Sequence, residues 1–71
     1  MREKLDALAT EMFDRGILLE DALRELEKRF LARALAATHG SIGDAAGRLG
    51  LHRNTLSRKI AEYKLKLPQH G

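Results

Sequence analysis

The chain contains no cysteine, and this absence excludes two common ways of stabilising a small protein. Neither a disulfide bond nor a thiolate metal site can form. The three histidines, His39, His52 and His70, stand far apart in the sequence with no carboxylate at ligand spacing, whereas a structural zinc site normally needs four ligands. We therefore expect no metal and no cofactor.

Valine is also absent, isoleucine occurs only three times and proline only once, so the propensity for β-structure is low and we predict an all-α fold. No apolar run approaches the roughly 20 residues that a membrane-spanning helix needs. Met1 is followed at once by alternating charges, which is not the pattern of a signal peptide. We therefore expect a cytoplasmic protein that has no membrane partner.

The residues that are present are typical of a folded helical protein, since 44% are apolar and 32% are charged. A length of 71 residues predicts a single domain. A monomer of this size buries little apolar surface, so that oligomerisation is the remaining source of stability in the absence of a disulfide or a metal.

Charge is distributed unevenly along the chain. Residues 1–40 hold seven Lys or Arg and eight Asp or Glu, a net charge of −1, whereas residues 41–71 hold six Lys or Arg and two Asp or Glu, a net charge of +4. A cationic surface on one part of a small domain suits a polyanion. The alternative is a surface that only aids solubility, and charge alone does not separate the two.

Two helices are predicted in the N-terminal half, the first from about Arg2 to Arg15 with Gly16 as a left-handed cap, and the second from about Glu20 to Thr38. The first helix has one apolar stripe, formed by Leu5, Leu8, Met12 and Phe13. The second helix has two. Its first strip has heptad-like spacing and consists of Leu19, Leu23, Leu26 and Phe30, extended by Ala34 and Ala37. Its second strip begins with Leu31 and Leu35. We expect the first strip to contact a partner subunit and the second to support the C-terminal half; the alternative is an intramolecular core alone.

Two shorter helices are predicted in the C-terminal half, from Ile42 to Leu49 and from about Arg53 to Lys64, and we expect a frayed tail after Leu67. Ser41 is a suitable N-cap for the first of them, and Asp44 stands near the capping-box position. The second buries an apolar row, formed by Leu56, Ile60 and Tyr63.

The turn between these two helices has the residues of a helix-turn-helix. Ala45 and Ala46 allow the helices to approach closely, and Gly50 supplies the backbone freedom that the turn needs. Leu49 and Leu51 fill the angle between the helices. The alternative for these packing residues alone is a helical hairpin in an unrelated bundle.

The side chains left outside this packing favour a DNA reader. The N-terminal end of a recognition helix enters the major groove, where Arg pairs with guanine, Asn with adenine and the Thr methyl with thymine. The residues expected at base edges are His52, Arg53, Asn54, Thr55, Ser57 and Arg58. The residues expected at phosphates are Arg48, Lys59, Lys64 and Ser41. No Asp or Glu occurs from Leu49 to Ala61, and we predict double-stranded DNA as the partner.

A specific pattern runs from Gly40 to Leu65. It is carried by Gly40-Ser41, Ala45-Ala46, Leu49-Gly50-Leu51, His52-Arg53-Asn54-Thr55-Leu56, Arg58-Lys59-Ile60 and Glu62-Tyr63. This pattern resembles the helix-turn-helix of the Fis family, the factor for inversion stimulation, which also ends many NtrC-type bacterial activators. The preceding run EDALRELEKRFLARAL is similar to the helix that leads into the module in these proteins.

The resemblance implies a homodimer in which residues 1–39 form dimerisation helices and residues 40–67 form the reader. The dimer interface expected from it and from the apolar strips is Leu5, Leu8, Met12, Leu19, Leu23, Leu26 and Phe30. It implies DNA contacts by Arg53, Thr55 and Arg58, with His52, Asn54 and Lys59 beside them, and bending of the duplex. His52 departs from the usual Ser or Asn, which weakens the cap of the recognition helix and leaves the imidazole to meet a phosphate.

The sequence therefore predicts a homodimeric, sequence-preferring DNA-binding protein of bacterial type, either a transcriptional regulator or a DNA-bending protein of the nucleoid. Proteins of the transcription machinery are further candidate partners. The alternative is a helical dimerisation or interaction module whose basic end meets an acidic protein. No enzyme is expected, because there is no Ser or Cys with an adjacent base, no paired carboxylates and no Gly-rich phosphate loop.

Overall fold

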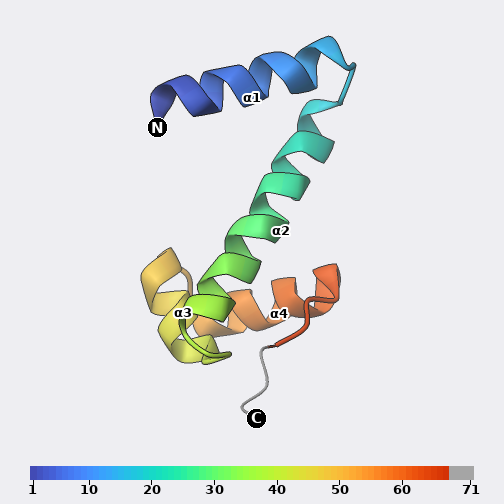
Figure 1. Ribbon diagram of the computed structural model, residues 1–71. Helices are drawn as coiled ribbons and strands as arrows, with labels where there is room; N and C mark the ends of the chain where they lie inside the picture. Colours follow the sequence, from blue (N-terminus) through green and yellow to red (C-terminus); the bar gives the residue numbers. More distant parts are fainter. Residues whose placement is uncertain (68–71) are drawn as a thin grey trace.

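The computed structural model describes residues 1–67, and within them the chain forms four α-helices and no strand (Figure 1). The helices are α1 (Arg2–Asp14), α2 (Leu19–Ala37), α3 (Ile42–Leu49) and α4 (Arg53–Tyr63). The prediction of an all-α fold is confirmed, and each predicted helix boundary lies within one residue of the observed one. The frayed tail predicted after Leu67 concerns residues 68–71, which lie outside the described part. Within that part, no helix combines the length and apolar character needed to cross a membrane.

Helix α2 is the longest helix and connects α1 to the C-terminal helices. Helix α1 leaves its N-terminal end at a steep angle, and α3 and α4 gather around its C-terminal end (Figure 1). The turn between α1 and α2 is made possible by Gly16, whose φ of 76° is the left-handed conformation predicted for it. The amide of Gly16 donates to the carbonyl of Phe13, and the amide of Ile17 donates to the carbonyl of Met12. These bonds satisfy carbonyls at the end of α1 and terminate the helix.

The core lies entirely in the C-terminal part of the described chain. Its buried apolar residues are Leu31, Leu35, Ala45, Ala46 and Leu56. Leu31 and Leu35 belong to the second apolar strip of α2, so the prediction that this strip supports the C-terminal half is confirmed. Ala34, which was assigned to the first strip, packs against this core instead. Helix α1 contributes no buried residue.

The first strip of α2 is exposed. Its leucines and the stripe of α1 line an apolar groove of about 740 Å³ in the angle between the two helices, whereas Phe30 does not line it. The α1–α2 groove is lined by Leu5, Leu8, Ala9, Met12, Phe13, Ile17, Leu19, Ala22, Leu23, Glu25, Leu26 and Arg29. Within residues 1–67, no part of the chain covers the apolar side chains that line this groove.

Candidate nucleic-acid interface

Helices α3 and α4 are held at their angle by small residues and a glycine turn. Ala45 and Ala46 are buried against the core, so the α3 backbone packs closely against α2 and α4. Gly50 caps α3 with a φ of 72°, and the amide of Leu51 donates to the carbonyl of Ala46 over 2.9 Å. Leu56 of α4, which is 0% exposed, belongs to the same buried cluster as Ala45 and Ala46. The predicted helix-turn-helix geometry is therefore present.

The start of α3 is fixed by Ser41 and Thr38. The Ser41 Oγ accepts the amide of Asp44 over 3.3 Å, which satisfies one of the free N–H groups at the helix start. The Thr38 Oγ1 donates to the carbonyl of Ala34 over 2.9 Å, and the amide of Ser41 donates to the carbonyl of Thr38 over 3.0 Å. Ser41 thus acts as the predicted N-cap.

The start of α4 is capped by the side chain of His52, and the expectation that this cap is weaker than one by Ser or Asn stays a prediction. Its Nδ1 accepts the amide of Asn54 over 3.1 Å. A ring nitrogen that accepts is unprotonated, so the N–H of the neutral imidazole lies on Nε2. His52 is exposed, and Nε2 is therefore a donor on the surface at the very end of α4 that the sequence assigns to DNA.

The solvent-facing side of α4 brings together most of the residues predicted at base edges. Arg53, Asn54, Ser57 and Arg58 are exposed, and Thr55 is half-buried. Cations also flank this surface at the end of α3 and the end of α4. Within residues 1–67, no ion pair is formed by Arg48, Arg53, Arg58 or Lys64. These four cations are all exposed, so their charge is not neutralised within the described chain.

Three of the seven Lys and Arg in the N-terminal half form ion pairs within the described chain. Arg15, Arg24 and Arg29 each pair with a carboxylate three or four residues earlier in the same helix. Such exposed pairs contribute little to stability, but they neutralise charge on α1 and α2. The other four Lys and Arg of residues 1–40 form no ion pair in the part of the chain that the structure describes, but this half carries a net charge of −1, so the excess of positive charge lies in the C-terminal half.

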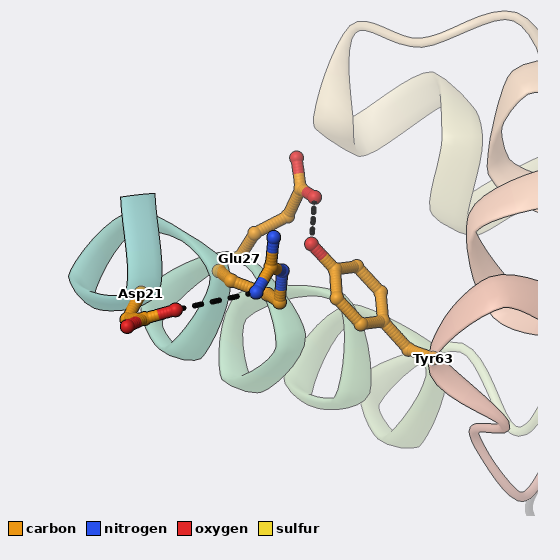
Figure 2. Close-up of polar contacts among 4 residues, drawn as sticks. Asp21, Glu27 and Tyr63 are labelled. Carbon is orange, nitrogen blue, oxygen red and sulfur yellow. Dashed lines mark hydrogen bonds and ion pairs between the residues drawn. The ribbon is translucent and has the colours of Figure 1, made fainter. Parts of the chain in front are cut away.

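Lys59, unlike Arg53 and Arg58 on the same helix, forms an ion pair. Its Nζ lies 3.1 Å from Oε2 of Glu27 on α2, and its side chain is only 28% exposed. The hydroxyl of Tyr63 donates to Oε1 of the same carboxylate (Figure 2). One carboxylate of α2 therefore binds two side chains of α4, and we call Glu27, Lys59 and Tyr63 the Glu27 cluster. Sequence reasoning placed Lys59 at phosphates and buried Tyr63, but it missed Glu27.

The Glu27 cluster perturbs its own ionisation. The hydrogen bond from Tyr63, followed by that from Lys59, holds the pKa of Glu27 below its ordinary value. The hydrogen bond to the Glu27 carboxylate, together with partial burial, raises the pKa of Tyr63 to about 12. One signal in the sequence pointed to this residue, because Glu27 stands one turn before Leu31 on the strip that faces α4.

Known proteins similar to this chain share its C-terminal part. Residues 22–63, more than half of the chain, match the family described as bacterial regulatory protein, Fis family. The DNA-binding transcriptional regulator NtrC of Proteus hauseri is 51% identical over 45 residues, which cover 63% of this chain and 10% of that protein. NtrC of Bradyrhizobium sp. (strain RP501 Parasponia) is 45% identical over 49 residues, covering 69% and 10%, and NtrC of Azospirillum brasilense is 40% identical over 50 residues, covering 70% and 10%. No solved structure matches the chain.

The chain thus spans about a tenth of the length of these curated relatives. The family match begins in α2 and ends at the last residue of α4, so it includes the core, the glycine turn and the Glu27 cluster. The resemblance inferred from the sequence pattern is confirmed. The chain belongs to the Fis family of bacterial regulatory proteins.

Proposed function

We propose that this chain is a homodimeric, sequence-preferring DNA-binding module that serves transcriptional regulation. The observation that carries the proposal is the pair of exposed arginines on α4, Arg53 and Arg58, which are mounted on a buried core and form no ion pair within residues 1–67. The relatives are named as DNA-binding transcriptional regulators, which supports the same function here. A module of this kind acts at the nucleoid of a bacterial cell, where it bends or marks DNA for other proteins of the transcription machinery.

In this proposal the N-terminal end of α4 enters the major groove. Arg53 and Asn54 carry the donors and acceptors that pair with guanine and adenine, and Thr55, Ser57 and Arg58 complete the reading face. Phosphate contacts come from Arg48, Lys64, the start of α3 and the His52 Nε2. Lys59 is left out of the set, because Glu27 already binds it.

The homodimer is proposed from the α1–α2 groove. Exposed leucines line it along both helices, and the described chain folds nothing over them. A second copy brings a matching apolar surface, and its α1 and α2 then complete a four-helix core with this one. The two readers lie at the far ends of the α2 helices, so that one dimer meets two sites on a duplex.

Binding across a salt series tests the DNA-binding proposal. The 71-residue chain is titrated with a duplex of about 25 base pairs, and the logarithm of the binding constant should fall linearly with the logarithm of salt concentration, by about 0.9 for each phosphate contact. Replacing both Arg53 and Arg58 by Ala should weaken binding and relax sequence preference. Lys4→Ala is the matched control, because Lys4 is an exposed, unpaired cation on α1.

The proposal fails if the chain binds no duplex at low salt, or if the double arginine variant binds as the Lys4→Ala control does. The alternative function, a helical module whose basic end binds an acidic protein, predicts that first result. It also predicts an acidic partner that an excess of duplex does not displace.

A further inference from the structure

The two halves of α4 are buried to different extents against the rest of the chain. Its first half is anchored by Leu56, which is fully buried. Its second half carries Ile60 and Tyr63, which are only partly buried against the core. Apolar packing is non-directional and leaves the second half free to tilt, whereas hydrogen bonds to a charged group fix both distance and direction.

The Glu27 cluster supplies those hydrogen bonds at this second half. Lys59 and Tyr63 stand four residues apart and so lie on one face of α4, and both reach the same carboxylate on α2. Figure 2 shows the contact between Tyr63 and Glu27. Other charged pairs, such as Arg24 with Asp21 on the same helix, join residues within a single helix. The Glu27 contacts instead span 32 and 36 residues of sequence and join two helices.

The position of Glu27 on α2 links the reader to the α1–α2 groove. Glu27 lies next to Leu26, which lines the groove, and one turn before Leu31, which lies beneath the reader. The segment of α2 that would contact a second copy therefore also holds α4. The angle between α4 and α2 sets how the reading face is presented relative to that interface.

We propose that Glu27 is a positioning residue, which fixes the angle of α4 on α2 and thereby the sequence discrimination of the reader, while it keeps Lys59 away from phosphate. This inference rests on the proposed DNA-binding function. Without the carboxylate, α4 tilts and a bidentate base contact is strained, so that discrimination between sites should fall by about tenfold or more. At the same time Lys59 is released, and a new phosphate contact steepens the salt dependence by about 0.9 per protomer.

Three variants of the 71-residue chain test the inference. Glu27→Gln keeps the shape of the side chain and removes its charge. Tyr63→Phe removes one hydrogen bond and alters no charge at neutral pH. Glu11→Gln is the control, because Glu11 is an exposed carboxylate on α1 whose ion pair with Arg15 lies outside the groove and the reader.

Each variant is measured on two duplexes: one selected by the wild type from a random pool, and one of the same length with that sequence scrambled. Glu27→Gln should lower the ratio of the two affinities about tenfold or more and steepen the salt slope. Tyr63→Phe should lower the ratio by a smaller factor and leave the slope unchanged. Glu11→Gln should leave the ratio within twofold of wild type. Helical content by circular dichroism identifies any variant that has merely unfolded, in which case Tyr63→Phe decides.

A spectroscopic signature separates positioning from a general structural effect. Tyr63 is the only tyrosine and the chain has no tryptophan, so alkaline absorbance reports this hydroxyl alone. The charged groups around it are Glu27 and Arg24 on α2 and Glu62 on α4, with Lys59 bound to the same carboxylate. The titration midpoint should fall toward the ordinary value of about 10 in Glu27→Gln and stay at the wild-type value in Glu11→Gln.

Two results overturn the inference: an unchanged Tyr63 midpoint in Glu27→Gln, or an unchanged affinity ratio in a folded Glu27→Gln protein. Both leave the proposed DNA binding standing, because the wild type still discriminates between the duplexes. If the wild type binds neither duplex, the proposed function fails and the inference fails with it.

Discussion

Truncation of Leu23 is expected to weaken the proposed homodimer. Leu23 lines the α1–α2 groove and is 57% exposed in the single chain. Burying a whole leucine side chain is worth about 1.5–3 kcal/mol, so covering the part that is still exposed contributes about 1–1.5 kcal/mol in each protomer. A dimer contains the residue twice, which brings the contribution to about 2–3 kcal/mol.

Alanine retains one of the four side-chain carbons, so about three quarters of this contribution is lost, and Leu23→Ala should raise the dimer dissociation constant by about 10- to 40-fold, at 1.4 kcal/mol for each factor of ten. Sedimentation equilibrium over a range of protein concentrations measures this constant directly. Leu18→Ala is the matched control, because Leu18 is the same residue type at 64% exposure and does not line the groove. A wild type that remains monomeric at every concentration, or two variants that shift equally, would refute the reasoning.

Three further predictions concern the reader and its attachment. Gly47→Ala should raise the free energy of unfolding by about 1 kcal/mol, because a Cβ there meets nothing within 4 Å; a lower value in urea unfolding would mean that α3 needs the glycine. His52→Ala should lower that free energy by about 1 kcal/mol through loss of the α4 cap, and His52→Asn should restore most of it, so equal losses in the two variants would exclude the cap. The lowered pKa of Glu27 stabilises the fold above the ordinary carboxyl pKa, and this stability is lost as pH falls through the lowered value. In urea unfolding, the free energy of unfolding of Glu27→Gln should therefore depend less on pH in that acidic window than that of the wild type. Parallel pH profiles would show that the cluster does not lower the pKa of Glu27.

The helices and the turn were predictable because their determinants are local. The spacing of apolar residues fixes which face of a helix is buried, and the caps at Ser41 and Gly50 act over five residues or fewer. The exposed cations of α4 were predictable for the same reason, since Arg53 and Arg58 are what the apolar row of α4 leaves outside. These features could be predicted without knowing how segments far apart in the sequence pack together.

The Glu27 cluster was not predictable in the same way. Lys59 looks like any exposed cation of a basic helix until the crossing of α2 and α4 brings it to a carboxylate 32 residues earlier. The hydrogen bond by which His52 caps α4 was not predictable, for a different reason. It depends on the rotation of the imidazole toward the amide of Asn54, and sequence preferences for Ser or Asn at such a position do not register that geometry.

The absence of buried residues in α1 has a consequence for how such chains diversify. The reader is held by residues from Leu31 onward and by Glu27, and none of these supports depends on the sequence of α1. A different N-terminal segment could therefore be joined ahead of α2 without rebuilding the core that orients α4. The relatives, which match over about a tenth of their length, carry the same module within much longer chains. Within residues 1–67, the core that orients α4 and the segment that precedes α2 are therefore structurally separable.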